Sequence, residues 1–388
     1  MRRRDLLRLA MFAAWPASGG AWAGASKRAA SIQAPTRTLV LVELKGGNDG
    51  LNTLVPYADE AYYRLRPRLA IAADAVLALD ERIGLHPALK PLMPAWSAGD
   101  LAWTQGVGYD HPSRSHFRSI DIWETATDAD VVSEVGWIPQ VLPAGASGAF
   151  PQLVILAGDD GIARGSGMQA ISLWTPERFA RTVARLGNRG PAHAHTEALS
   201  HIIAVRDAAR QAGRTFEHML TRLPDVPDKF PQSPLGRQLQ QAARMLLAGM
   251  DIPVIKVQIG SFDTHSKQLA RHERLLKQLA EALAAFREAM VAAGRWDQTL
   301  VVSYSEFGRQ VRENGSFGTD HGTAAPHLAM GGRVKGGLYG LPPDLNNLEQ
   351  KDIRHTVEFR QLYATIAERW WRLERHPWRG RFPAMEWI

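Results

Sequence analysis

The sequence predicts an α/β domain with a mainly parallel sheet and helices on both of its faces. Continuous apolar runs rich in β-branched residues, typical of strands buried on both sides, alternate with longer segments of helical periodicity. Each major apolar run also ends in a polar loop flanked by glycine. The chain has 388 residues, of which 45% are hydrophobic, so it can bury one large core or two small ones.

Strands are expected where the apolar runs are short and bounded by turn residues. The first, at 38–42, leads into a glycine-rich turn at 45–50. The other expected strands, in chain order, are 101–107, 152–156, 252–259 and 299–303, and a short apolar run follows at 326–330. Because polar residues follow each of these runs, the carboxyl ends of the strands are the natural place for a site.

Helices are expected in the intervening segments, where apolar residues recur at helical spacing. They are expected at 87–96, around 120–123, and at 196–223, 235–250, 269–293 and 359–373. Residues 125–235 contain fewer clear strands and several Gly and Pro breaks, which favours a helical cap or insertion. We expect one α/β domain over 37–388.

The N-terminus has the pattern of an export signal. Residues 1–23 combine an arginine cluster, a short apolar stretch and a small-x-small cleavage pattern, and residues 24–36 have the composition of a tether. The order Arg3-Arg4-Asp5-Leu6-Leu7 predicts a twin-arginine signal, with an ordinary secretory signal or a retained anchor as alternatives. We therefore expect the twin-arginine translocase as a partner, a periplasmic or secreted location, and no stable membrane span after cleavage.

Composition excludes several classes of function. The first eight residues contribute +3 of the net charge of +7, and the sequence after residue 8 carries 42 basic and 38 acidic side chains, a small surplus that is spread out. Since no Lys/Arg run lies beyond the N-terminus, nucleic-acid binding is not expected. The chain has no cysteine, which excludes disulfides, thiolate metal sites and cysteine nucleophiles.

The polar residues that follow the strands have the chemistry of a divalent metal site. Carboxylate and imidazole ligands together suit zinc, manganese or iron better than calcium, which prefers oxygen ligands alone. The expected ligands are Asp49, Asp263, His265, Glu306, Asp320 and His321. Each also has a simpler interpretation, such as a turn residue, a solvated histidine or a surface ion pair. Their joint occurrence at strand ends favours one shared site.

The segment between the second expected strand and the following helix contributes further candidates. Ser113 and Ser115 lie at the expected start of a helix, where serine commonly caps the first turn. They are alternatively nucleophiles or metal ligands at the positive end of that helix. Arg114, Asn48 and His116 are the expected substrate-binding residues, with Arg114 placed to bind an oxyanion.

Five strings resemble the signatures of one bacterial family, the domain of unknown function 1501, in the family's order. They are Leu41-Val42-Glu43-Leu44-Lys45-Gly46-Gly47-Asn48-Asp49-Gly50-Leu51-Asn52, Pro112-Ser113-Arg114-Ser115-His116-Phe117, Phe262-Asp263-Thr264-His265, Ser305-Glu306-Phe307-Gly308-Arg309 and Gly318-Thr319-Asp320-His321-Gly322. That family is grouped with the alkaline phosphatase and sulfatase superfamily. The resemblance implies an alkaline phosphatase-like fold with Asp263, His265 and His321 around one ion, and Asp49 and Glu306, with Ser115 as a further candidate ligand, around a second.

The resemblance also implies an activity, and two departures weaken it. Phe307 stands where the superfamily often has a histidine ligand, and Asp110 stands two residues before the proline, at the nucleophile position. The first hypothesis is an exported metal-dependent hydrolase of a small anionic phosphate or sulfate ester, with one or two ions, zinc or manganese. The alternative is a non-catalytic alkaline phosphatase-like envelope protein that binds a partner or a glycan.

Overall fold

The computed structural model describes residues 37–142, 151–165, 168, 170–173, 226 and 229–388. The expected signal (1–23), tether (24–36) and helix at 196–223 lie outside these residues, as does most of the expected insertion at 125–235. The domain boundaries therefore stay a prediction. No helix in the described part of the chain is long and apolar enough to cross a membrane.

The described residues form one large sheet with the first strand near its centre. Strand β1 (Thr38–Leu44) pairs in parallel with β8 (Val254–Ile259) on one side and with β9 (Thr299–Tyr304) on the other. The strand order is β11-β5-β10-β9-β1-β8-β6-β7, and β12 also pairs with β5. The remaining strands are β5 (Leu101–Gly108), β6 (Leu153–Ile155), β7 (Ala170–Ser172), β10 (Ala325–Gly331), β11 (Gly337–Tyr339) and β12 (Val357–Glu358).

Most neighbours in this sheet are parallel, as the sequence predicts. The exception is β10, which runs antiparallel to both β5 and β9. The carboxyl ends of β1, β8 and β9 therefore point the same way, and the loops that follow them meet at one edge of the sheet.

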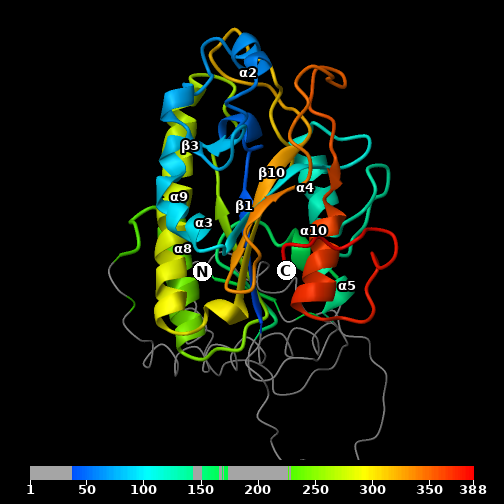
Figure 1. Cartoon of the computed structure of the whole chain (residues 1–388). Coiled ribbons are helices and arrows are strands. Elements are labelled where there is room, and N and C mark those ends of the chain that lie inside the picture. The colour runs from blue at the N-terminus through cyan, green and yellow to red at the C-terminus, as the bar shows by residue number, and fades with distance from the viewer. Residues whose placement is uncertain (1–36, 143–150, 166–167, 169, 174–225, 227–228) are drawn as a thin grey trace, which may run out of the picture.

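Helices cover both faces of the sheet (Figure 1). On one side lie α8 (Pro234–Leu247), α9 (Gln268–Ala292) and the short α3 (Met93–Ser97), and on the other lie α4 (His116–Thr125), α5 (Trp137–Val141) and α10 (Arg360–Thr365). Alternate residues of β1 separate the two cores: Val40 and Val42 pack with α8 and α9, whereas Leu39 and Leu41 pack with α4 and α10. The predicted α/β class with helices on both faces is confirmed.

A small subdomain follows β1 and was not predicted. Helix α2 (Glu60–Leu65) packs beside a three-stranded antiparallel sheet whose strands have two residues each. These strands are β2 (Leu54–Val55), β3 (Leu77–Ala78) and β4 (Gly84–Leu85). Short 3-10 helices cover Gly50–Asn52, Ala73–Ala75, Pro87–Leu92, Gly161–Ala163 and Trp296–Gln298, and a π-helix at Ile366–Trp370 continues α10. The expected helices at 87–96 and 359–373 are thus only partly α-helical.

Candidate metal centre

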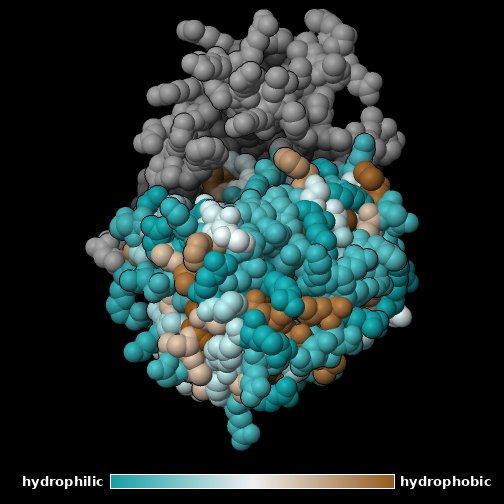
Figure 2. Space-filling model, turned by 90° about the horizontal axis from the view of Figure 1, so that it is seen from above, coloured by the Kyte–Doolittle hydropathy of each residue, from teal (hydrophilic) through white to brown (hydrophobic). Residues whose placement is uncertain are grey.

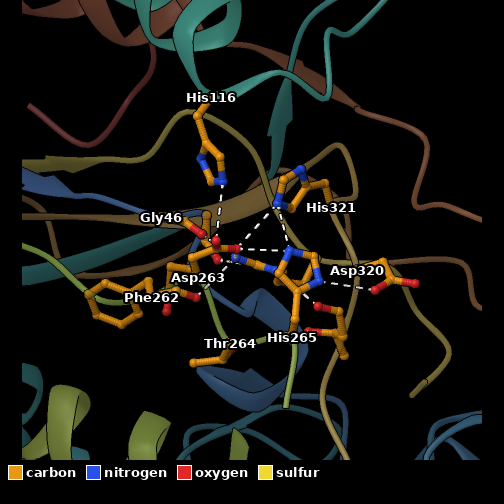
Figure 3. Close-up of polar contacts among 12 residues, drawn as sticks. Gly46, His116, Phe262, Asp263, Thr264, His265, Asp320 and His321 are labelled. Carbon is orange, nitrogen blue, oxygen red and sulfur yellow. Dashed lines mark hydrogen bonds and ion pairs between the residues drawn. The ribbon is translucent and has the colours of Figure 1, made fainter. Parts of the chain in front are cut away.

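Three histidines and one aspartate converge at the carboxyl end of the central strands (Figure 3). Asp263 and His265 follow β8, His321 precedes β10, and His116 is the first residue of α4. Asp263 Oδ1 lies 3.0 Å from His265 Nε2 and 3.2 Å from His321 Nε2. His116 Nε2 lies 3.6 Å from the other oxygen, Asp263 Oδ2. Ligand atoms of His116, Asp263 and His321 all lie within 4.8 Å of one another.

Each of these histidines has its Nδ1 atom bound to an acceptor outside the cluster. The three bonds are His116 Nδ1 to Glu306 Oε1 (2.9 Å), His265 Nδ1 to Asp320 Oδ1 (3.1 Å) and His321 Nδ1 to the Arg114 carbonyl (2.8 Å). A carboxylate or carbonyl oxygen can only accept, so each Nδ1 carries a proton, and in the neutral form of each ring the lone pair of Nε2 faces the centre. This is the arrangement in which histidines bind metals.

The donor set fits a cation. His265 Nε2 and His321 Nε2 lie 2.9 Å apart, so two lone pairs would face each other unless a positive charge lies between them. His116 Nε2 is buried and has no hydrogen-bond partner in the described chain. Ligands of a tetrahedral zinc ion lie about 3.3 Å from one another, close to the spacing of these atoms. The cluster is thus a possible His/Asp metal site.

Electrostatics favour the metal-binding charge states of Asp263 and His321, but not that of His116. Burial alone would raise the pKa of Asp263, but the hydrogen bond and charge of Arg309, with His321 and His265, lower it to about 2. Burial lowers the pKa of His321. At neutral pH Asp263 is therefore ionised and His321 is neutral. The hydrogen bond with Glu306 instead raises the pKa of His116.

Arg309 joins the loops that carry these residues. Its guanidinium side chain is fully buried and donates to Asp263 Oδ1 (2.6 Å), to the Gly47 carbonyl (2.8 Å) and to the Thr319 carbonyl (2.9 Å). Gly46 has a φ of +117°, and a Cβ there would lie 2.4 Å from Asp263 N. Only glycine at position 46 allows the loop that follows β1 to approach the loop that contains Asp263 this closely.

Asp49 and Glu306, the residues expected at a second ion, are engaged elsewhere. Asp49 is buried and ion-paired with Arg66 at 2.7 Å. Burial would raise the pKa of Asp49, but Arg66 and His272 hold it below its ordinary value. Glu306 is also buried, and its Oε1 accepts from the Gly46 N–H (2.8 Å) as well as from His116. Asp320 supports His265 and is not directed at the centre.

The other expected site residues are divided between the cluster and the scaffold. Ser115 is the exposed N-cap residue of α4, and its side chain makes no capping bond. Ser113 Oγ accepts from the Ser115 N–H at 3.2 Å. The Arg114 side chain pairs with Asp352. Asn48 is buried, and its Oδ1 lies 2.9 Å from His272 Nε2, so it belongs to the scaffold.

Several supporting residues were missed by sequence reasoning. Arg309 lies in one of the five motifs but had no assigned role, and its spacing from Asp263 gives no indication of contact. Arg66 and Gln268 lie outside all five motifs, and both bind Asp49. No periodicity or spacing rule connects residues so far apart in the chain, so only the folded structure reveals these contacts.

A family model described as "Protein of unknown function (DUF1501)" matches residues 178–371, half of the chain. The chain belongs to this family. The resemblance inferred from the five motifs is confirmed. A search of curated proteins finds no match to the DUF1501 chain.

The DUF1501 chain is similar to three solved structures from bacteria. A protein in the alkaline phosphatase superfamily from Vibrio parahaemolyticus is 13% identical with a TM-score of 0.37, over 81% of this chain and 64% of that one. The lipoteichoic acid synthase LtaP from Listeria monocytogenes is 10% identical with a TM-score of 0.33, over 79% and 66%. The sulfatase PsFucS1 from Pseudoalteromonas sp. is 9% identical with a TM-score of 0.40, over 90% and 71%.

The DUF1501 chain thus spans about two thirds of the length of the first two of these structures. At such TM-scores the similarities carry no weight in assigning an activity.

Proposed function

We propose that this chain binds one divalent transition metal ion through Asp263, His265 and His321, with His116 as the fourth group. The observation that carries the proposal is the common orientation of the three imidazoles, each held through Nδ1 so that Nε2 faces Asp263. A set of three nitrogens and one carboxylate favours zinc, with manganese as the alternative.

We further propose that the site hydrolyses a phosphate or sulfate ester. A divalent ion there would polarise an ester oxygen and lower the pKa of a bound water. Asp263 is 45% exposed at its side chain, so a substrate can reach it. The end of the molecule seen in Figure 2 is mostly hydrophilic with smaller hydrophobic patches, which supports a polar substrate. The predicted export signal supports a substrate outside the cytoplasm.

Ser115 is the better of the two candidate nucleophiles. Its hydroxyl makes no capping bond and lies next to His116, at the N-terminus of a ten-residue helix that favours an anion. Ser113 Oγ is already an acceptor for the Ser115 N–H. Arg114 would bind the substrate with the guanidinium atoms that its pairing with Asp352 leaves free.

One observation favours the second candidate function, a non-catalytic protein that uses the metal for stability or for binding a partner or glycan. The Asp49 carboxylate that a second ion would need is neutralised by Arg66 with both side chains fully buried. A two-ion clamp on attacking and leaving oxygens is therefore not available, and hydrolysis would have to proceed with one ion.

The test begins with chelator-treated full chain to which zinc or manganese is returned. We expect one ion per chain by elemental analysis, and metal-dependent turnover of aryl phosphates or aryl sulfates. Asp263→Asn should weaken metal binding at least about 100-fold, more than is typical for residues that only support a ligand. Asp130→Asn, at an exposed aspartate, is the matched control and should bind as the wild type does. A wild-type chain that takes up no metal refutes the site, and metal uptake without turnover leaves the non-catalytic function.

A further inference from the structure

We infer that Gln268 is a positioning residue. It holds the loop that carries Asp263 and His265 against the loop that carries His321, without touching the metal. The inference deepens the proposed function and rests on it. Gln268 is the first residue of α9 and is completely buried. None of the five motifs contains it, and neither the centre nor its supporting hydrogen bonds to histidine include it.

The side chain of Gln268 connects three loops. Its Oε1 accepts from Thr264 Oγ1 at 3.0 Å and from Thr319 Oγ1 at 2.7 Å, and its Nε2 donates to Asp49 Oδ2. Thr264 lies between the ligands Asp263 and His265, and Thr319 lies two residues before His321. One amide thus bonds to both segments that supply three of the four metal-binding groups.

The backbone reinforces the same junction. Thr319 N–H donates to the Thr264 carbonyl at 3.2 Å, and Gln268 N–H donates to the Phe317 carbonyl at 2.8 Å. These bonds fix the spacing of the loops, whereas the amide of Gln268 fixes the rotation of the two threonines. Because ligand atoms must be held within about 0.5 Å of their productive positions, small shifts here change metal affinity.

Asp49 and Arg66 anchor this amide to the rest of the site. Arg66 donates from Nη1 to both oxygens of Asp49, and it also binds the carbonyls of Val311 (2.8 Å) and Gln310 (2.9 Å), which directly follow Arg309. Asp49 thereby links the loop that follows β1, the segment that follows Arg309 and the side chain of Gln268. The carboxylate expected to bind a second ion is instead the centre of a buried network that aligns the first.

The first test replaces Gln268 by Met, which has a similar volume and cannot make these hydrogen bonds. We expect zinc affinity, measured by chelator competition, to fall about 10- to 100-fold, and the visible absorption spectrum of the cobalt-loaded chain to change. Gln105→Met, at a buried glutamine of β5 whose Oε1 has no partner, is the matched control and should leave both readouts unchanged. Wild-type affinity and spectrum in Q268M would overturn the inference.

A second test adds a carboxylate at position 268 and then removes the one at position 49. Recovery of zinc binding in the double variant would show that the loss in the single variant is not a folding defect. Gln268→Glu brings a carboxylate against Asp49 and should weaken zinc binding. In the double variant D49N/Q268E the amide of residue 49 can donate to the new carboxylate, so affinity should recover at least tenfold over Q268E. Thr319→Val, which removes only the hydrogen bond from Thr319 Oγ1 to Gln268 Oε1, should bind zinc more weakly than the wild type, so it tests the inference even where Q268M does not fold. A double variant no better than Q268E, or a T319V chain with wild-type affinity, would overturn the inference.

The two proposals fail in different ways. A wild-type chain that binds no zinc or cobalt refutes the metal centre and, with it, any positioning role. A wild-type chain that binds metal, together with variants of Gln268 that bind equally well, refutes only the role of Gln268.

Discussion

Among the described residues, the three histidines of the candidate centre differ in burial from His272 and His327. His116, His265 and His321 are partly exposed, and each has one ring nitrogen held by an acceptor. His272 and His327 are completely buried, and burial lowers the pKa of His272 to about 4 and that of His327 to about 3. The three partly exposed imidazoles turn Nε2 toward Asp263, where a cation can bind, whereas the buried pair stays neutral and makes the fold sensitive to acid.

The pH dependence predicted for His327 can be measured directly. Its pKa is about 3 in the folded chain and near 6.5 when unfolded, so the unfolded state binds more protons between these values. Stability is therefore present above pH 6.5 and is lost as the pH falls, by about 2 kcal/mol at pH 5 from this residue alone. His327→Leu also removes an Nδ1 atom that has no partner in the described chain.

Urea unfolding at pH 7 and pH 5 checks this prediction, because the midpoint and slope of each transition together give the free energy of unfolding. H327L should lose about 2 kcal/mol less than the wild type between the two pH values. His272 remains in both proteins, so its own contribution cancels in the comparison. An H327L chain that loses as much stability as the wild type would contradict the assignment.

At the scale of elements, the two serines at the start of α4 can be tested separately for a structural role and for a catalytic one. Ser115 occupies the N-cap position without a side-chain cap, so Ser115→Ala should change the free energy of unfolding by less than about 0.5 kcal/mol. Ser113 accepts the Ser115 N–H, so Ser113→Ala should cost about 1 kcal/mol. If Ser115 is the nucleophile, S115A loses ester turnover and keeps its metal, while S113A keeps turnover. An S115A chain with full turnover would exclude Ser115 from the reaction.

Element length explains how much of the fold could be predicted. The long helix α9 and the buried strands β1, β8 and β9 have clear periodicity or apolar runs, and they lie where the sequence indicates. The two-residue strands β2, β3 and β4 are too short to show any alternation, so the subdomain around α2 was missed. The antiparallel direction of β10 depends on the path of the chain before the strand, and an apolar run has the same pattern in either direction.

The same reasoning explains which part of the site could be predicted. Asp263, His265 and His321 follow or precede strands of one sheet, and strand ends meet at one edge, so their convergence follows from topology. Asp49 also lies at that edge, but it forms a buried ion pair with Arg66 at the end of α2. Helix α2 belongs to the subdomain that was not predicted from the sequence. A local motif indicates which residues are polar, and only the long-range partner decides which of them remain free for a metal.

For the whole molecule, the candidate centre lies where separate parts of the fold are joined by polar bonds. Two apolar cores hold the sheet between its helix layers, and a smaller apolar cluster packs loop residues such as Leu51 and Val311 with α2. The chain has no cysteine, so no disulfide joins the loops beyond the strand ends. Arg309, Arg66 and Gln268 connect them instead, all from buried positions. A bound ion would add a further link between segments more than 50 residues apart, such as His265 and His321.

Metal binding should therefore stabilise the whole chain, since these segments come apart when it unfolds. An ion that binds only the folded state adds about 2.7 kcal/mol at a free concentration of 100 Kd. For a domain of this size that increment raises the midpoint of thermal unfolding by about 4 °C, given roughly 2 cal/mol/K of unfolding entropy per residue. Differential scanning calorimetry of chelator-treated chain with and without zinc measures the shift. Asp263→Asn should reduce the shift to about 1 °C or less at the same zinc concentration, and Asp130→Asn should preserve it. An equal rise in the wild type and D263N would mean that zinc stabilises the fold from another site.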